Sequence, residues 1–219
     1  MIAEEMGKIS TRTEEVQSLL IEPASLADIG GLVELLNLKR PTAWIKKISL
    51  SGLKRFLEYS IDNPRSIILL ARSDNDNAAG YVFSTIDTGR FWLGFALRHP
   101  ATMLAIMYYR LRNIVELKIQ RKNKTPEQEG DAHLPGFSWS PNGPGAARIV
   151  GILVRKEHRG KGVATKLYYR LFEALKEKKC VKVEEYMGPD YDQFAGKFHN
   201  CGWDLQQLRG AGYKMTKLL

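Results

Sequence analysis

Cysteine is scarce in this chain of 219 residues, which has only Cys180 and Cys201. Two cysteines cannot build a disulfide framework, so a reduced, cytoplasmic setting is expected. Their separation does not fit a metal site and the four histidines lie far apart, so no metal is expected. We predict that both cysteines are core residues, because free cysteine is among the most buried residue types.

Long apolar runs are also missing. No uninterrupted run reaches the roughly 18 residues needed to span a bilayer. The first residues lack the basic-then-apolar pattern of a secretory signal. Residues 1–17 are polar and aperiodic, so we predict a flexible N-terminal tail followed by one domain over residues 18–219.

The composition, 44% apolar and 26% charged, is that of an ordinary soluble globular protein. The net charge of +9 suits an anionic ligand, an acidic partner or an anionic membrane surface, and it does not choose among them. The chain lacks the interleaved aromatic and basic residues of single-strand binding proteins, so no nucleic-acid partner is expected.

The most informative segment is a strand, a glycine loop and a helix. The apolar run 149–154 predicts the strand, and the amphipathic run that follows the loop predicts the helix. The start of a helix leaves backbone N–H groups without partners and favours negative charge. Gly160 and Gly162 let the loop turn those groups toward a ligand, and Arg159 and Lys161 add positive charge. The segment therefore predicts a pocket for phosphate or pyrophosphate.

The segment from Val154 to Ala164, V-R-K-E-H-R-G-K-G-V-A, resembles a known acetyl-CoA signature. That signature, V-x-x-x-x-R-G-x-G-x-[GA], belongs to the GCN5-related N-acetyltransferase (GNAT) family. The dinucleotide fingerprint would need a third glycine, and the loop is too short for a P-loop. A second segment, Asp192–Trp203, is similar to the family motif N-x-x-A-x-x-[FL]-Y-x-x-x-G-[FW], with one residue fewer before the glycine. Here Asp192 replaces the Asn of the motif and His199 replaces its Tyr.

The resemblance implies an α/β fold with a central mixed, mostly antiparallel twisted sheet flanked by helices. It implies that two neighbouring strands diverge and that pantetheine pairs with the exposed edge along Ile149–Val154. The residues that it assigns to acetyl-CoA are Ile152, Leu153, Val154, Arg159, Gly160, Lys161, Gly162, Val163, Ala164, Thr165 and Asp192. The backbone N–H of Val154 is the implied donor to the oxyanion.

The resemblance also implies direct attack of a neutral amine on the thioester, which needs a base and benefits from a proton donor. His199 stands at the donor position and can donate a proton near neutral pH. No base stands out from the residues. Glu184 and Glu185 are adjacent on a predicted strand and face opposite sides of the sheet, and we name Glu185 as the candidate. The alternatives in the chain are Glu184, Asp131 and His133.

Local patterns predict the remaining elements. Helical spacing and a capping-box-like start at Ser25 indicate a helix to Leu36, and a second helix is expected over residues 50–61. The expected strands cover residues 18–22, 66–72, 79–86, 180–186 and 212–218, and further helices are expected over 163–178 and 190–200.

Residues 88–146 depart from the compact pattern of the family and form a predicted insertion. Residues 91–97 are dense in large apolar groups, and the apolar residues after Pro100 keep helical spacing. Many basic residues surround them, and residues 122–145 resemble a long loop. Three interpretations stay open. The insertion packs on the domain as an added helix, it covers the acceptor site or forms a dimer interface, or it makes a peripheral membrane contact through residues 91–124.

The expected function is N-acetyl transfer from acetyl-CoA to a small amine, for which an amino sugar is the first choice. A long-chain acyltransferase that uses acyl-CoA or acyl carrier protein is an alternative. A non-catalytic CoA-binding sensor is another, and a basic surface-binding protein is the last. The acceptor itself is not encoded in any motif of the chain.

Overall fold

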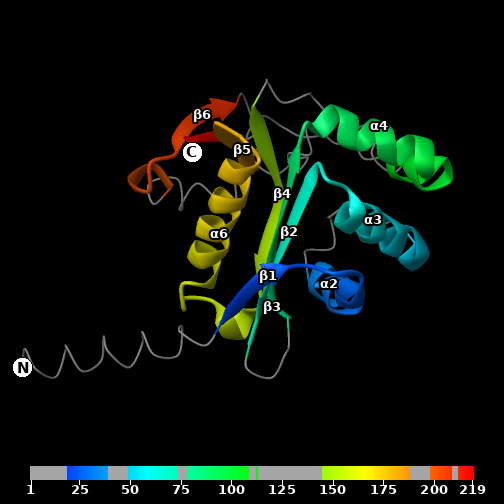
Figure 1. The fold of residues 1–219 in the computed structure, drawn as a ribbon, viewed down its shortest axis with the longest axis horizontal. Helices are drawn as coiled ribbons and strands as arrows, with labels where there is room; N and C mark the ends of the chain where they lie inside the picture. The colour runs from blue at the N-terminus through cyan, green and yellow to red at the C-terminus, as the bar shows by residue number, and fades with distance from the viewer. Residues whose placement is uncertain are drawn as a thin grey trace, which may run out of the picture.

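The computed structural model describes residues 19–38, 49–73, 78–108, 112, 145–187, 198–208 and 212–219. The elements follow in the order β1 (Leu20–Pro23), η1 (Leu26–Asp28), α2 (Ile29–Asn37), α3 (Leu50–Asp62), β2 (Ser66–Arg72), β3 (Ala78–Ile86), α4 (Thr88–Arg98), β4 (Ala146–Val154), η4 (Lys156–His158), α6 (Val163–Glu177), β5 (Lys182–Met187), β6 (Asp204–Leu208) and β7 (Gly212–Leu218). Figure 1 shows α2, α3 and α4 on one side of the sheet and α6 on the other.

The described strands form one seven-stranded sheet in the order β1-β2-β3-β4-β5-β7-β6. Neighbouring strands are antiparallel everywhere except between β4 and β5, which run parallel. The parallel pair follows from the chain path, because α6 crosses over between β4 and β5. The predicted fold class, a mixed and mostly antiparallel sheet flanked by helices, is confirmed.

On the first side of the sheet, a cluster of aromatic rings joins α3, α4 and β3. The Phe56 ring lies 5.6 Å from the Trp92 ring in a stacked arrangement and 5.8 Å from the Phe83 ring edge-on. Tyr59 is buried beside them and donates its hydroxyl to the backbone carbonyl of Phe91 over 3.0 Å. Pairs of this kind stabilise a core beyond the area that they bury. The start of the insertion is therefore an added helix that packs on the domain, as the first interpretation states.

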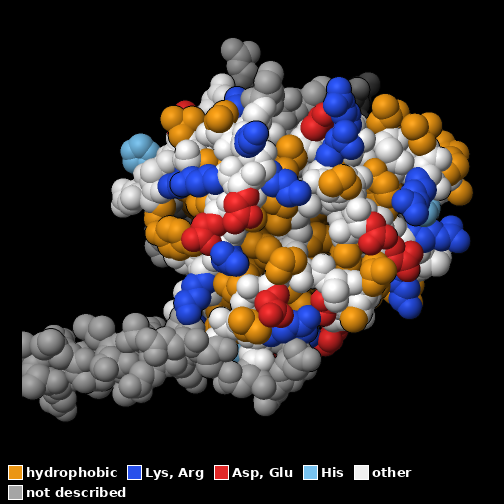
Figure 2. Space-filling view, in the orientation of Figure 1, with side chains coloured by type: hydrophobic (Ala, Val, Ile, Leu, Met, Phe, Trp, Pro, Cys, Tyr) orange, Lys and Arg blue, Asp and Glu red, His pale blue; other side chains and the backbone are white. Residues whose placement is uncertain are grey.

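The outward side of the insertion is apolar as well. Leu93 and Leu97 on α4 are exposed, and Leu104 is exposed in the helical residues 100–108, which begin at Pro100. Figure 2 shows apolar side chains beside Lys and Arg side chains on this side of the molecule, where Figure 1 places α3 and α4. The dimer and membrane interpretations are not tested by these contacts and stay predictions. Residues 109–111 and 113–144 lie outside the described residues.

On the second side, α6 covers the sheet. Leu167, Leu171 and Leu175 are fully buried and pack in one cluster with β2, β3, β4, β5 and β7. Spacings of three and four residues put these leucines on one face of the helix, so the predicted apolar face of α6 is confirmed. No helix among the described residues is both long and apolar enough to cross a membrane.

Most predicted elements are confirmed within a few residues of their expected ends, and the capping box of Ser25 with Asp28 is present. Strand β6 was not predicted, because Asp204–Leu208 is a polar strand at the edge of the described sheet, where it pairs with β7. Cys180 is buried as expected. The core prediction for Cys201 is wrong: Cys201 is exposed, because it lies in the turn between the helical residues 198–200 and β6.

Candidate active site

Strands β4 and β5 pair only at their beginnings. Their register joins Ala146 to Lys182, Ala147 to Val183 and Arg148 to Glu184. Beyond these pairs both strands continue, β4 to Val154 and β5 to Met187, but the structure describes no further pairing between them. Residues 146–149 are buried whereas residues 150–154 are partly exposed. The divergence predicted for Ile149–Val154 is thus present, and it leaves a backbone edge that needs partners.

A bulge on β4 lies where the divergence begins. In the register with β3, Gly151 lies opposite Phe83 and Ile149 lies opposite Ser84, so Val150 is the extra residue. A bulge bends its strand and increases the local twist, which turns the rest of β4 away from β5. The Ser84 hydroxyl donates to the carbonyl of Arg148 over 3.0 Å and holds the last paired residue in place.

The loop after β4 presents the start of α6. Gly160 and Gly162 have φ values of 77° and 76°, in the left-handed region where residues with a Cβ are strained. Gly162 is the N-cap of α6, and no side chain caps this helix. The N–H groups of the first turn are therefore free of intrahelical partners, and the helix dipole favours an anion in front of them. This geometry is the one that the sequence predicted for the phosphate pocket.

Side chains anchor the loop to the sheet. Arg159 donates from Nε to the carbonyl of Val154 over 3.1 Å, so its exposed guanidinium stays beside the end of β4. Arg155 donates from Nε to the carbonyl of Ala78 over 2.7 Å and pairs with Glu34 on α2 at 3.0 Å. A Cβ on Gly80 would lie 2.7 Å from the carbonyl oxygen of Leu153, so only glycine fits opposite the end of β4. These contacts hold the end of β4, from which the loop starts, in a fixed position.

Glu184 is held among cations at the closed end of the divergence. It is 4% exposed, and its carboxylate lies 3.0 Å from Lys214 Nζ and 3.3 Å from an Arg148 nitrogen. Burial would raise the pKa of this carboxyl, but the hydrogen bond and charge of Lys214, and then those of Arg148, outweigh it and leave the pKa below its usual value. A lone arginine inside the apolar run of β4 was a signal for this cluster, because buried arginine needs a partner.

Glu185 faces the other side of the sheet, toward α6. It is 8% exposed, and Tyr168 on α6 donates its hydroxyl to the Glu185 carboxylate over 2.7 Å. Glu185 is also the first β5 residue beyond the pairs with β4. It therefore borders the opening between the strands. Tyr168 was expected only as part of the apolar face of α6, and its link to Glu185 was not predicted.

His199 lies in the helical residues 198–200, with its side chain exposed. Its neighbour Phe198 packs on Tyr168 and Trp203, with ring centroids 6.5 Å and 6.2 Å apart. The segment of His199 thus lies on the same side of the sheet as Glu185. Asp192, Asp131 and His133 lie outside the described residues.

The residues assigned to the cofactor lie together along one path. Ile152, Leu153 and Val154 form the end of β4, the loop carries Arg159 to Lys161, and Gly162 to Thr165 open α6. A diverging strand edge that ends at an uncapped, glycine-lined helix start is the geometry expected for the cofactor site of an acyl-CoA-dependent acyltransferase. The site suits a ligand with amides at one end and a pyrophosphate at the other.

Comparison with known families agrees with this class. The sequence profile of the acetyltransferase (GNAT) family matches residues 32–203. The chain therefore belongs to the GNAT family and is an acyl-CoA-dependent N-acyltransferase. No curated protein sequence matches the chain significantly.

Solved structures share the fold at low sequence identity. The PaiA N-acetyltransferase of Thermoplasma acidophilum, solved with coenzyme A, is 12% identical with a TM-score of 0.56, and 92% of this chain and 99% of that one are covered. The spermidine N-acetyltransferase of Vibrio cholerae is 12% identical with a TM-score of 0.56, over 92% and 94%. The ribosomal-protein-S18-alanine N-acetyltransferase of Escherichia coli is 8% identical with a TM-score of 0.52, over 91% and 93%. The fold thus serves different acceptors.

Proposed function

We propose that this chain transfers an acetyl group from acetyl-CoA to the primary amine of a small acceptor, such as an amino sugar. The observation that carries the proposal is the divergence of β4 from β5 next to the uncapped start of α6. Acetyl-CoA supplies the activated acyl group as a thioester. The named spermidine acetyltransferase, which acts on a small amine, supports the acceptor class.

The backbone of the chain would hold the donor. The edge of β4 from Ile152 to Val154 offers N–H and C=O groups to the pantetheine amides, which removes the cost of an unpaired edge. The first turn of α6 offers N–H groups to the pyrophosphate, and Arg159 and Lys161 offset its remaining charge. The N–H of Val154 remains the candidate donor to the oxyanion.

Side chains would manage the protons. Glu184 is a weak base, because its neighbouring cations stabilise the carboxylate and hold its pKa low. Glu185 borders the opening, accepts a hydrogen bond from Tyr168 and remains the candidate base for the attacking amine. His199 is exposed and remains the candidate donor to the departing thiolate.

The test is the release of free CoA thiol from acetyl-CoA across a panel of amino sugars, polyamines and amino acids. Turnover with a small amine supports the proposal. Palmitoyl-CoA is compared with acetyl-CoA as the donor in the same assay, and faster turnover with palmitoyl-CoA would favour the long-chain acyltransferase. Tight CoA binding without thiol release from any amine would favour a non-catalytic sensor and overturn the proposal.

A matched pair of glycine variants tests the cofactor loop. Gly162→Ala places a Cβ in a left-handed residue at the start of α6, and Gly145→Ala does the same before β4, where φ is 67°. Each variant costs about 1–2 kcal/mol of backbone strain. We expect only Gly162→Ala to weaken CoA binding, by about tenfold or more, measured by calorimetry. Equal affinities in the two variants would show that the loop does not bind CoA.

A further inference from the structure

A polar cavity lies away from the cofactor loop, between α3 and the insertion. Its volume is about 180 Å³, and its walls are Ser49, Ser51, Gly52, Arg55, Ala101, Thr102 and Ala105. The first four belong to the start of α3 and the last three to the helical residues 100–108. The other end of α3 leads into β2, so the cavity lies at the end of the helix that is remote from the sheet.

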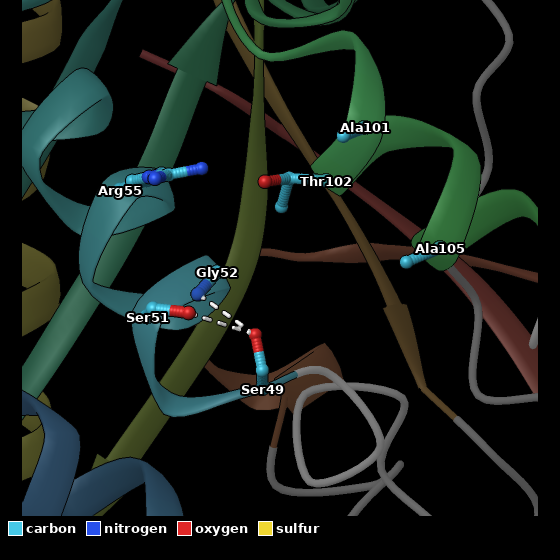
Figure 3. Close-up of a pocket in the computed structure, with 7 residues that line it drawn as sticks. All are labelled: Ser49, Ser51, Gly52, Arg55, Ala101, Thr102 and Ala105. Carbon is cyan, nitrogen blue, oxygen red and sulfur yellow. Dashed lines mark hydrogen bonds between the residues drawn. The ribbon is translucent and has the colours of Figure 1, made fainter.

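The wall from α3 carries two hydroxyl groups and a guanidinium. Ser49 is the N-cap of this 13-residue helix, and its hydroxyl accepts from the N–H of Gly52 over 3.1 Å. The Ser51 hydroxyl lies 3.1 Å from the Ser49 hydroxyl. Arg55 makes no ion pair with any described carboxylate, and Figure 3 shows its guanidinium extended toward the opposite wall. A helix start, a guanidinium and hydroxyl groups are together suited to an oxyanion.

The wall from the insertion adds an independent observation. Thr102 is only 8% exposed, and its hydroxyl has no hydrogen-bond partner among the described residues. Figure 3 shows this hydroxyl pointing across the cavity toward Arg55. The hydroxyl is open to the cavity, so a ligand there would give it a hydrogen-bond partner.

Small residues keep the cavity open. Ala101 and Ala105 form its floor on the insertion side. A Cβ on Gly52 would lie 3.2 Å from the Ser49 hydroxyl and 3.3 Å from Thr102, so a larger residue would crowd the space. The field there is positive as well. Burial lowers the pKa of the nearby His99, and the charges of Arg98 and then Arg55 lower it further.

We propose that this cavity binds a phosphoryl group, with Arg55 as the charged ligand and with Thr102 and the serine hydroxyls as donors. The proposal gives the start of the insertion a binding role. The acetyl-CoA loop at α6 belongs to a different part of the fold, so the site is a second anion site and does not depend on the proposed acceptor.

The experiment is a titration of the full chain with inorganic phosphate at constant ionic strength, followed by calorimetry. The protein is first saturated with CoA, so that phosphate does not occupy the α6 loop. The heat of that first step reports CoA binding separately, and failure of one site is distinguished from failure of the other. A parallel titration with glycerol phosphate distinguishes a phosphate monoester from the free ion, and acetate serves as the carboxylate probe.

The variants are Arg55→Met and Thr102→Val, with Arg65→Met as the control because Arg65 is an exposed arginine beyond the other end of α3. We expect Arg55→Met to weaken phosphate binding by about tenfold or more and Thr102→Val by about threefold or more, because a hydrogen bond to a charged group is lost. The control should bind like the unmodified chain. Equal binding by Arg55→Met and the control, or no phosphate binding by the CoA-loaded protein, would overturn the proposal.

Discussion

Glu184 and Glu185 are neighbours on β5 with the same side chain, yet their surroundings differ in almost every respect. Glu184 lies on the side of three cations, Arg148, Lys182 and Lys214, which all form ion pairs with its carboxylate. Glu185 lies on the side of α6, where a tyrosine hydroxyl is its described donor. Alternation along the strand places them on opposite faces, and each face then decides the chemistry.

The difference separates a structural role from a chemical one. A carboxylate fixed by cations stays ionised and stabilises the closed end of the divergence, so its removal should be felt in folding. Glu185 is the proposed base at the border of the opening, so we expect its removal to be felt in turnover.

The largest effect on stability is expected from Glu184→Gln. The neutral amide would remove the buried negative charge that Arg148, Lys182 and Lys214 contact, which costs about 3 kcal/mol of the free energy of unfolding. Urea unfolding of the purified chain measures the difference. A loss below about 1 kcal/mol would mean that water already screens the cluster.

The pH dependence of the same variant sharpens this result. The pKa of Glu184 is lower in the folded chain than its ordinary value of 4.5, so the carboxylate contributes stability above that pH. The contribution is lost as the pH falls below 4.5 toward the folded pKa. The stability difference between the unmodified chain and Glu184→Gln should therefore shrink in acid. A constant difference would contradict the assignment.

A smaller loss of stability, about 1 kcal/mol, is expected from Glu185→Gln, because the amide oxygen still accepts from Tyr168. If Glu185 is the base, kcat should fall by about 10²-fold while CoA affinity stays unchanged. Tyr168→Phe is the control, since it removes the hydrogen bond but leaves the carboxylate. A similar drop in kcat in both variants would assign Glu185 a positioning role.

The smallest effect on stability, within about 0.5 kcal/mol, is expected from His199→Phe, because the side chain is exposed. CoA affinity should stay the same, and turnover should fall only if His199 donates the proton to the thiolate. Rates of thiol release against pH provide the measurement. An unchanged rate at every pH would exclude the donor role.

Much of this arrangement could be predicted from local sequence. The glycines of the loop predicted a turn that presents the start of α6, and the spacing of Leu167, Leu171 and Leu175 predicted the buried face of that helix. The opposite orientation of Glu184 and Glu185 also follows from alternation alone. Alternation does not predict which of the two contacts the cations, because this depends on the pairing of β5 with β4 and β7.

Other features depend on contacts between distant segments. Strand β6 is polar and exists because β7 pairs with it. In the sequence Thr102 is an ordinary threonine, and only the packing of α3 opposite it shows that it lines a cavity. Cysteine is a typical core residue, but Cys201 lies in a turn. For β6 and Thr102, contacts between distant segments determine the structure, and the local pattern could not predict them.

The bulge on β4 shifts the alternation of side chains between the two faces of the sheet by one residue. Before Val150, odd-numbered residues such as Ile149 face α6; after it, even-numbered residues, Ile152 and Val154, face α6. Val150 and Leu153 pack on the opposite core. Residues that face either side of the sheet must therefore be apolar, which is why the run 149–154 shows no alternation. The backbone donors and acceptors along the edge shift by one residue together with the side chains. The position of one extra residue thus sets which backbone groups lie at the proposed pantetheine site, so a deletion there would exchange them while a substitution would not.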